Sequence, residues 1–210
     1  MVSTLQVESL KIFDEFGNHI GEATRDEVHK NGFWHETFHC WLMSIENGIP
    51  MIYFQKRSQT KKDFPNLLDI TAAGHLLSHE TVSDGIREVH EELGIEVNIE
   101  EVLPLGIVKN SINLQNFHDH ELSHVFLLKR NEPFTKFNLQ KEEVSGIVKA
   151  NFNEYYDFAY GLSESIEVEG FEVNEQNEKI TVRKTVNKEH FVIHENNYLF
   201  SVLELLKQHV

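Results

Sequence analysis

The stretch of sequence that decides the fold is residues 74–95, GHLLSHETVSDGIREVHEELGI. Thr81 followed three residues later by Asp84 predicts a capping box, and Gly94 lies where a glycine commonly ends a helix. The sequence therefore predicts a helix over residues 81–93. Its apolar side chains recur at about 100° per residue and share one narrow stripe: Val82, Ile86, Val89 and Leu93.

A second face of this helix carries three carboxylates, Glu88, Glu91 and Glu92, roughly 120–180° away from the apolar stripe. Carboxylates at this spacing repel one another unless a cation binds between them. Mg²⁺ or Mn²⁺ is the natural choice because hard cations take oxygen ligands. Arg87 lies one turn before Glu91, where it is placed to orient a ligand carboxylate. Taken alone, such a helix is more often a solvated acidic face, so the wider pattern has to decide.

That wider pattern resembles the Nudix box, G-x5-E-x7-R-E-U-x-E-E-x-G-U, in which U is aliphatic. Gly74 and Glu80 have the required spacing, and residues 87–95 match throughout. The one departure is that six residues, not seven, separate Glu80 from Arg87. The flanking resemblance covers roughly residues 25–155.

The resemblance implies a metal-dependent hydrolase that cleaves the phosphoanhydride of an organic diphosphate, such as a nucleoside diphosphate derivative. Bound metal neutralises phosphoryl charge and lowers the pKa of a water molecule. By this likeness Glu88, Glu91 and Glu92 are the metal ligands, with the Gly74 carbonyl as a further one. Residues expected to act in catalysis are Glu91, Glu92, Arg87 and Glu121. The general base is one of the box glutamates or one of three carboxylates outside it: Glu121, Glu142 and Glu143.

Within the Nudix proteins, the chain is similar to the branch that includes isopentenyl diphosphate isomerase. The similarity is carried by residues 34–42 (WHETFHCWL), by the basic and Phe-Pro positions of residues 56–65 and by residues 72–75 (AAGH). In that branch histidines and an acidic pair gather a metal. The matching residues here are His35, His75, Asp119 and Glu121, and His29 lies near the place of a third histidine. They are candidates for a second metal site or a substrate contact, and polar packing is the alternative for the histidines.

Two departures from the isomerase favour hydrolysis. Its catalytic cysteine corresponds to Ala73, and Cys40 lies elsewhere in the sequence. Its box is eroded, whereas this chain keeps the complete run of Arg87 and the three glutamates. An isomerase of isopentenyl diphosphate and a non-catalytic, diphosphate-binding regulatory module are the alternatives.

The weaker candidates lie outside the box. Arg57 and Lys61 belong to a polar loop with Lys62 and are predicted to contact substrate phosphate. Trp34 and Phe64 are candidates for a pocket wall, although packing is the simpler interpretation. Strand alternation places Glu121 on one face and three histidines on the other: His118, His120 and His124.

Composition limits the partners. The 210 residues hold 19 Lys and Arg against 34 Asp and Glu, a formal charge of −15, and 40% are hydrophobic. An acidic chain is repelled by nucleic acid and by anionic membranes, so neither is expected as a partner. A single cysteine excludes an internal disulfide and a cysteine-built zinc site. Met1–Val7 does not resemble the start of a signal peptide and no apolar run is long enough for a bilayer, so a cytoplasmic location is expected.

The order of predicted elements indicates an α/β fold, and the resemblance implies a Nudix α/β/α sandwich with a mixed sheet. We expect a core domain over residues 1–164 and a C-terminal hairpin and helix over residues 165–210, packed on the core and available for a homodimer contact. Strands or hairpins are predicted at 8–18, 38–55, 68–73, 95–97, 102–108, 122–129, 147–152 and 167–186, and helices at 154–160 and 197–209.

Overall fold

The computed structural model describes residues 8–115 and 117–210. Within them the strands are β1 Ser9–Phe13, β2 His19–Thr24, β3 Trp34–Glu46, β4 Ile49–Arg57, β5 Leu68–Asp69, β6 Ala72–His75, β7 Val102–Leu114, β8 Phe117–Lys129, β9 Val144–Asn151, β10 Ile166–Val173 and β11 Lys179–Val186. The α-helices are α1 Arg25–Asn31, α2 Arg87–Leu93, α3 Phe152–Ala159 and α4 Asn196–Lys207. Short 3-10 turns are η1 Val82–Ile86, η2 Ile99–Glu101, η3 Phe134–Lys136 and η4 Lys188–His190.

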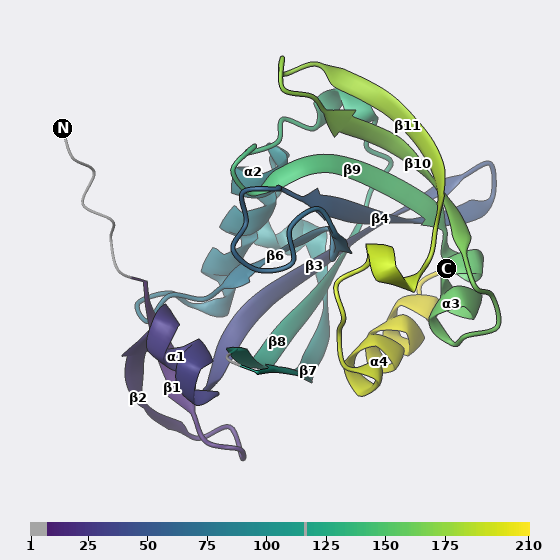
Figure 1. Cartoon of the computed structure of the whole chain (residues 1–210). Coiled ribbons are helices and arrows are strands. Elements are labelled where there is room, and N and C mark those ends of the chain that lie inside the picture. Colours follow the sequence, from purple (N-terminus) through teal and green to yellow (C-terminus); the bar gives the residue numbers. More distant parts are fainter. Residues whose placement is uncertain (1–7, 116) are drawn as a thin grey trace.

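The strands of the described residues form one mixed sheet around β3 (Figure 1). The order β11-β10-β9-β4-β3-β1-β2 is antiparallel throughout, and β8 adds to β3 as a parallel neighbour. The short strand β6 also pairs with β3 and β5 pairs with β4. This arrangement confirms the predicted α/β class and the mixed sheet.

Alternating side chains of β3 separate two cores. Trp41 and Met43 pack with α3 and α4 on one face of the sheet, whereas Phe38 and Leu42 pack with α2 on the other. The helices therefore cover both faces, as expected for a helix/sheet/helix sandwich. None of these helices has both the length and the hydropathy needed to cross a bilayer, within residues 8–115 and 117–210.

The helix predicted over residues 81–93 is wrong in its first half. Residues Val82–Ile86 form the 3-10 turn η1, and the α-helix begins only at Arg87. Gly85 explains the tight turn, because a Cβ there would lie 2.7 Å from the Phe38 ring and only glycine permits this approach. Both ends are as predicted. Thr81 and Asp84 form the capping box, and Gly94 ends α2 with a φ of 66°.

Two other predicted elements differ. Residues 95–97 form no strand, because the Glu96 carbonyl accepts a hydrogen bond from the Arg130 side chain (3.0 Å) instead of a neighbouring strand. The strand predicted over 68–73 is divided into β5 and β6. At the bend, the Thr71 hydroxyl donates to the Tyr53 carbonyl and accepts from the Leu42 amide, which replaces ladder hydrogen bonds.

The C-terminal residues are joined to the rest of the molecule through the sheet. The predicted hairpin is β10–β11, and β10 pairs with β9 over residues 169–172. Helix α4 packs its buried face on the core, and the segment between β11 and α4 returns to β5 through an isolated bridge of Phe191 to Leu68. The division into residues 1–164 and 165–210 stays a prediction.

Candidate active site

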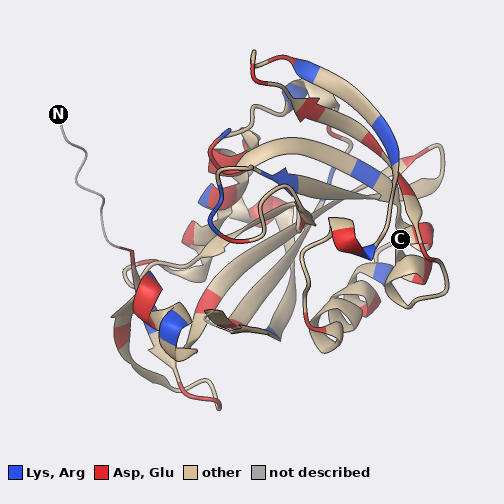
Figure 2. Cartoon of the chain, viewed as in Figure 1, with Lys and Arg blue, Asp and Glu red and all other residues tan. Residues whose placement is uncertain are grey.

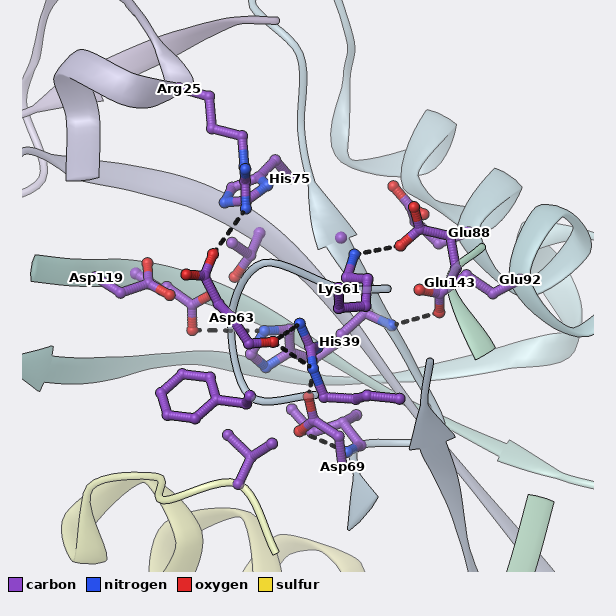
Figure 3. Close-up of a pocket in the computed structure, with 18 of the residues that line it drawn as sticks. Arg25, His39, Lys61, Asp63, Asp69, His75, Glu88, Glu92, Asp119 and Glu143 are labelled. Carbon is purple, nitrogen blue, oxygen red and sulfur yellow. Dashed lines mark hydrogen bonds and ion pairs between the residues drawn. The ribbon is translucent and has the colours of Figure 1, made fainter. Parts of the chain in front are cut away.

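A cavity of about 940 Å³ gathers most of the predicted site residues. It lies between α2, the loop of residues 58–67, β8 and the segment before α4. Figure 3 shows acidic side chains of α2 on one side and His75 and Asp119 on another. The predicted residues that line it are Arg57, Lys61, Gly74, His75, Arg87, Glu88, Glu91, Glu92, Asp119, Glu121, Glu142 and Glu143.

Of the two aromatic wall candidates, Phe64 lines this cavity and Trp34 does not. Trp34 instead packs beside His120, with ring centroids 5.2 Å apart, and beneath the Lys109 ammonium at 4.9 Å. Trp34 therefore packs on the histidine side of β8, in agreement with the simpler packing interpretation.

The carboxylates of α2 differ sharply in exposure. Glu88 and Glu92 are buried, whereas the Glu91 side chain keeps 51% of its surface exposed. Burial raises the pKa of Glu88 to about 7 and raises the pKa of Glu92 well above its usual range. The charge of Glu91 also raises the pKa of Glu88, and the charge of Glu88 raises that of Glu92, as expected for like charges in one site. The face is therefore not a solvated one.

Arg87 organises this cluster. Its guanidinium donates to Glu80 at 2.6 Å, to Glu88 at 2.6 Å and to Glu91 at 3.2 Å. Glu80 also accepts a hydrogen bond from the Leu77 amide. Glu80 thus reaches Arg87 although the box is one residue short, because the 3-10 turn η1 takes up the missing length.

The geometry around Gly74 fits a cation. A Cβ at this position would lie 2.1 Å from the Glu88 carboxylate, so the β6 backbone and that carboxylate are in close approach. Glu92 accepts from the Ala73 amide and from Gln55 Nε2, both at 3.2 Å. Two buried carboxyls beside the β6 backbone form an oxygen-rich donor set suited to Mg²⁺ or Mn²⁺.

A second group of ligand-type side chains meets at the far side of the cavity. One ligand atom from each of His29, His35, His75 and Asp119 lies within 4.8 Å of all the others. The predicted set held three of these residues and Glu121. His29, expected near the place of a third histidine, joins the group from α1, and Glu121 lies outside it.

Hydrogen bonding fixes the state of His35. Its Nδ1 lies 3.1 Å from the Phe33 carbonyl, which only accepts, so Nδ1 carries the proton. The lone pair of Nε2 then points toward Asp119 Oδ1, 3.4 Å away, and both atoms are buried without a hydrogen-bond partner. Burial lowers the pKa of His35 and that of His75, which favours neutral, ligand-type imidazoles. Two buried acceptor atoms that face each other repel, and a cation bound between His35 Nε2 and Asp119 Oδ1 would remove that repulsion.

Glu121 occupies the floor of the cavity in the middle of β8. Its Oε2 accepts from Asn110 Nδ2 at 2.8 Å and lies 3.6 Å from His39 Nε2 and 3.4 Å from Ser123 Oγ. Burial alone would raise the pKa of Glu121. Charge and a hydrogen bond from His39, with a hydrogen bond from Asn110, outweigh that burial, and the net pKa lies well below the usual range. As predicted, the three histidines of this strand lie on the other face, where His118 and His120 contact Asn113 and His124 contacts Glu36.

The two predicted phosphate contacts line the cavity but are each paired with a carboxylate. Arg57 donates to Asp69 at 2.9 Å, and Lys61 pairs with Glu143. Asp69 is buried, and hydrogen bonds and charge from His194 and Arg57 outweigh that burial and lower its pKa to about 2. A phosphate would have to compete with these acids for its cations.

The sequence alone missed several residues of the site. Gln55 supports Glu92, and Asp69, Asn110, His39 and His194 form hydrogen-bonded contacts around Glu121 and Arg57. No motif marks these side chains. For Gln55, Asn110 and His39 the only available signal was their polar character within otherwise apolar strands, and His194 lies in the loop before α4.

Comparison with known proteins agrees with this geometry. A model of the NUDIX domain matches residues 34–163. An uncharacterised Nudix hydrolase of Clostridium acetobutylicum is 37% identical over 202 residues, which cover 96% of this chain and 98% of that protein. An isopentenyl-diphosphate Delta-isomerase of Photorhabdus laumondii is 26% identical over 160 residues, 75% of this chain and 88% of that protein.

Among solved structures, a Deinococcus radiodurans protein shares the fold with a TM-score of 0.54 and 20% identity, and the match covers 70% of this chain and 86% of that one. The domain match spans more than half of the 210 residues and contains the complete carboxylate cluster of α2. The chain belongs to the Nudix hydrolase family.

Proposed function

We propose that this protein is a divalent-metal-dependent hydrolase that cleaves the diphosphate bond of an organic diphosphate, such as a nucleoside diphosphate derivative. The observation that supports this most strongly is the pair of buried carboxyls, Glu88 and Glu92, held beside the Gly74 backbone in a large cavity. Glu88, Glu91, Glu92 and the Gly74 carbonyl would hold Mg²⁺ or Mn²⁺. The ion would supply charge neutralisation on phosphoryl oxygens and a water of lowered pKa.

The chain's own side chains have separate tasks in this proposal. Arg87 holds the carboxylates in one orientation through its contacts to Glu80, Glu88 and Glu91. Arg57 and Lys61 give positive charge to the cavity lining and are the proposed phosphate contacts. Glu121, held on β8 by its contact with Asn110, is the proposed general base, with Glu142 and Glu143 as the alternatives in the cavity.

The test is hydrolysis of a panel of nucleoside diphosphate derivatives, dinucleotides, prenyl diphosphates and coenzyme A with Mg²⁺ or Mn²⁺, followed by phosphate release. Glu91→Gln and Glu92→Gln should each lower turnover by orders of magnitude while the unfolding temperature changes little. Glu100→Gln, at an exposed position, is the matched control. Near-normal turnover in both box variants would contradict the metal-site assignment, and metal binding without turnover on the whole panel would favour a non-catalytic binding module.

Isomerisation of isopentenyl diphosphate is the second candidate, and the cavity argues against it. Ala73 stands where the isomerase-like pattern has its cysteine, and its amide is engaged with Glu92. Cys40 is buried among apolar side chains of the α2 face, where burial raises its thiol pKa to about 12. Isotope exchange into isopentenyl diphosphate in deuterated water should therefore be undetectable.

We further propose that His29, His35, His75 and Asp119 hold a second divalent ion, because the lone pairs of His35 and Asp119 face each other unpartnered. Adding Co²⁺ to the protein should give visible d–d absorption, which His75→Ala weakens and Glu92→Gln leaves in place. His90→Ala is the control, since His90 is exposed and contacts Glu96. An unchanged spectrum in His75→Ala would refute this assignment.

A cytoplasmic location and a homodimer formed through residues 165–210 stay predictions. The solution mass of the whole chain, measured by sedimentation, tests the second.

A further inference from the structure

The segment before and within α4 sends two polar side chains toward the site, although it lies beyond the matched domain. His194 lines the cavity and Tyr198 is fully buried behind it. Each of the two residues is linked to the same atom, Glu121 Oε2, through one intermediate side chain. His194 contacts Asn110 and Tyr198 contacts His39, and both intermediates are buried and in contact with that oxygen.

The first of these two routes, from Glu121 through Asn110 to His194, is a series of hydrogen bonds whose donors and acceptors can be assigned starting from Glu121. The Asn110 side chain donates from Nδ2 to Glu121 Oε2 at 2.8 Å. The second hydrogen of Nδ2 points to His194 Nδ1, 3.2 Å away, which must therefore accept. His194 then carries its proton on Nε2 and donates it to Asp69 at 2.9 Å. The Asn110 oxygen accepts from the Glu195 amide, which completes the attachment of this segment.

The second route has the same polarity. His39 Nε2 faces Glu121 Oε2 at 3.6 Å and carries a proton there, which leaves Nδ1 as an acceptor. The Tyr198 hydroxyl lies 2.6 Å from that Nδ1 and donates to it. Burial raises the pKa of Tyr198 well above its usual range, so the hydroxyl keeps its proton.

Both routes leave one carboxylate oxygen available. Oε2 is surrounded by Asn110, His39 and Ser123, whereas Oε1 makes no hydrogen bond to any of the residues that the structure describes. A core made only for stability would place apolar side chains here, because burying polar groups is costly unless all are satisfied. The polar contacts to Oε2 instead hold the Glu121 carboxylate in one orientation at the cavity.

We propose that residues 188–207 are part of the active site, with His194 and Tyr198 as positioning residues that fix the Glu121 carboxylate through Asn110 and His39. The expected effect on kcat rests on the proposed hydrolase function, whereas the expected effect on the orientation of the Glu121 carboxylate does not. The residues act on orientation, so their loss should lower kcat and leave KM nearly unchanged.

Conservative variants separate positioning from packing. Tyr198→Phe keeps the ring and removes only the donor to His39, and should lower kcat about fivefold to tenfold, the value of one net hydrogen bond. Tyr156→Phe is the matched control, because it removes a hydroxyl contact to Glu204 on α4 far from the cavity. At position 194, Asn keeps an acceptor in the place of Nδ1, whereas Gln keeps a donor in the place of Nε2. His194→Asn should therefore retain kcat, and His194→Gln should lose it about as far as Tyr198→Phe.

Crystal structures of the variants provide the readout that does not depend on activity. In Tyr198→Phe and His194→Gln, the Glu121 carboxylate should leave its present orientation, and in His194→Asn and Tyr156→Phe it should keep it. If the carboxylate and kcat are unchanged in all four variants, or if Tyr156→Phe loses kcat equally, the inference is wrong although hydrolysis stands. If the wild type hydrolyses no diphosphate but the carboxylate moves as expected, the proposed function fails and the positioning role stands.

Discussion

At the scale of single residues, burial gives neighbouring members of one motif different chemistry. Glu88 and Glu92 lie on the inner side of a seven-residue helix, and Glu91 lies at its rim. Burial opposes the charged form of the inner pair, so without a cation these carboxyls hold protons at a pH where an exposed glutamate has lost its own. Binding of the proposed metal would therefore be coupled to proton release at this helix.

Glu88 should make the metal-free protein less stable as the pH rises. Its pKa is about 7 in the folded chain, above the reference value of 4.5. A raised folded pKa contributes stability that is present below about pH 4.5 and is lost as the pH passes 7, by up to about 3 kcal/mol. Glu88→Gln cannot titrate, so the free energy of unfolding of wild type in EDTA should fall relative to this variant between pH 5 and pH 8.

The measurement is urea unfolding of both proteins at each pH, with Glu100→Gln as the surface control. A constant difference between wild type and Glu88→Gln over the whole range would show that burial does not retain the proton.

At the scale of elements, the box works because a loop, a 3-10 turn and a short helix are joined at fixed points. The capping box of Thr81 and Asp84 starts η1, Gly85 allows it to approach Phe38, and Gly94 ends α2. The missing residue between Glu80 and Arg87 is absorbed in η1, and the ion pair between the two is kept.

Gly85→Ala should destabilise the protein by about 2 kcal/mol, because the new methyl group would meet the Phe38 ring at 2.7 Å in a closely packed core. Turnover should fall as well, since η1 sets the position of Arg87 at the start of α2. Thermal and urea unfolding measure the first effect. Ser83→Ala, at an exposed position of the same turn, should have neither effect.

How much the sequence could predict follows from these elements. The box glutamates, Arg87, the capping box at Thr81 and the helix end at Gly94 could be predicted, because helix periodicity and caps depend on residues a few positions apart. Asn110, Asp69 and His194 could not, because they reach Glu121 and Arg57 by strand pairing and chain return from distant parts of the sequence. The choice between a pocket wall and packing for Trp34 stayed open for the same reason, since only the pairing of β3 with β8 sets which face it occupies.

At the scale of the whole molecule, the charge of −15 is spread over many elements, and part of it converges on the cavity (Figure 2). Cations on the cavity wall are paired with acids, as Arg57 is with Asp69 and Lys61 with Glu143. The anionic substrate of the proposed hydrolase would therefore meet a surface of its own sign and would depend on bound divalent ions for attraction.

Divalent ions should consequently stabilise the protein beyond simple screening. In EDTA-treated protein, adding Mg²⁺ or Mn²⁺ should raise the unfolding temperature more than NaCl at equal ionic strength, because binding to the folded state adds to screening. Glu88→Gln and Glu92→Gln should reduce this excess. Equal shifts for both salts would mean that the ions act on the surface charge alone.

The contact between His39 and Tyr198 also affects when the protein becomes active during its synthesis. The two residues are 159 positions apart in the chain, and β3 must in addition find β8 as a parallel partner. Contacts of such long range close late and slow the folding of a domain. In the proposed network, Glu121 would therefore be ordered only after Tyr198 has been synthesised and the sheet and both helical layers have closed.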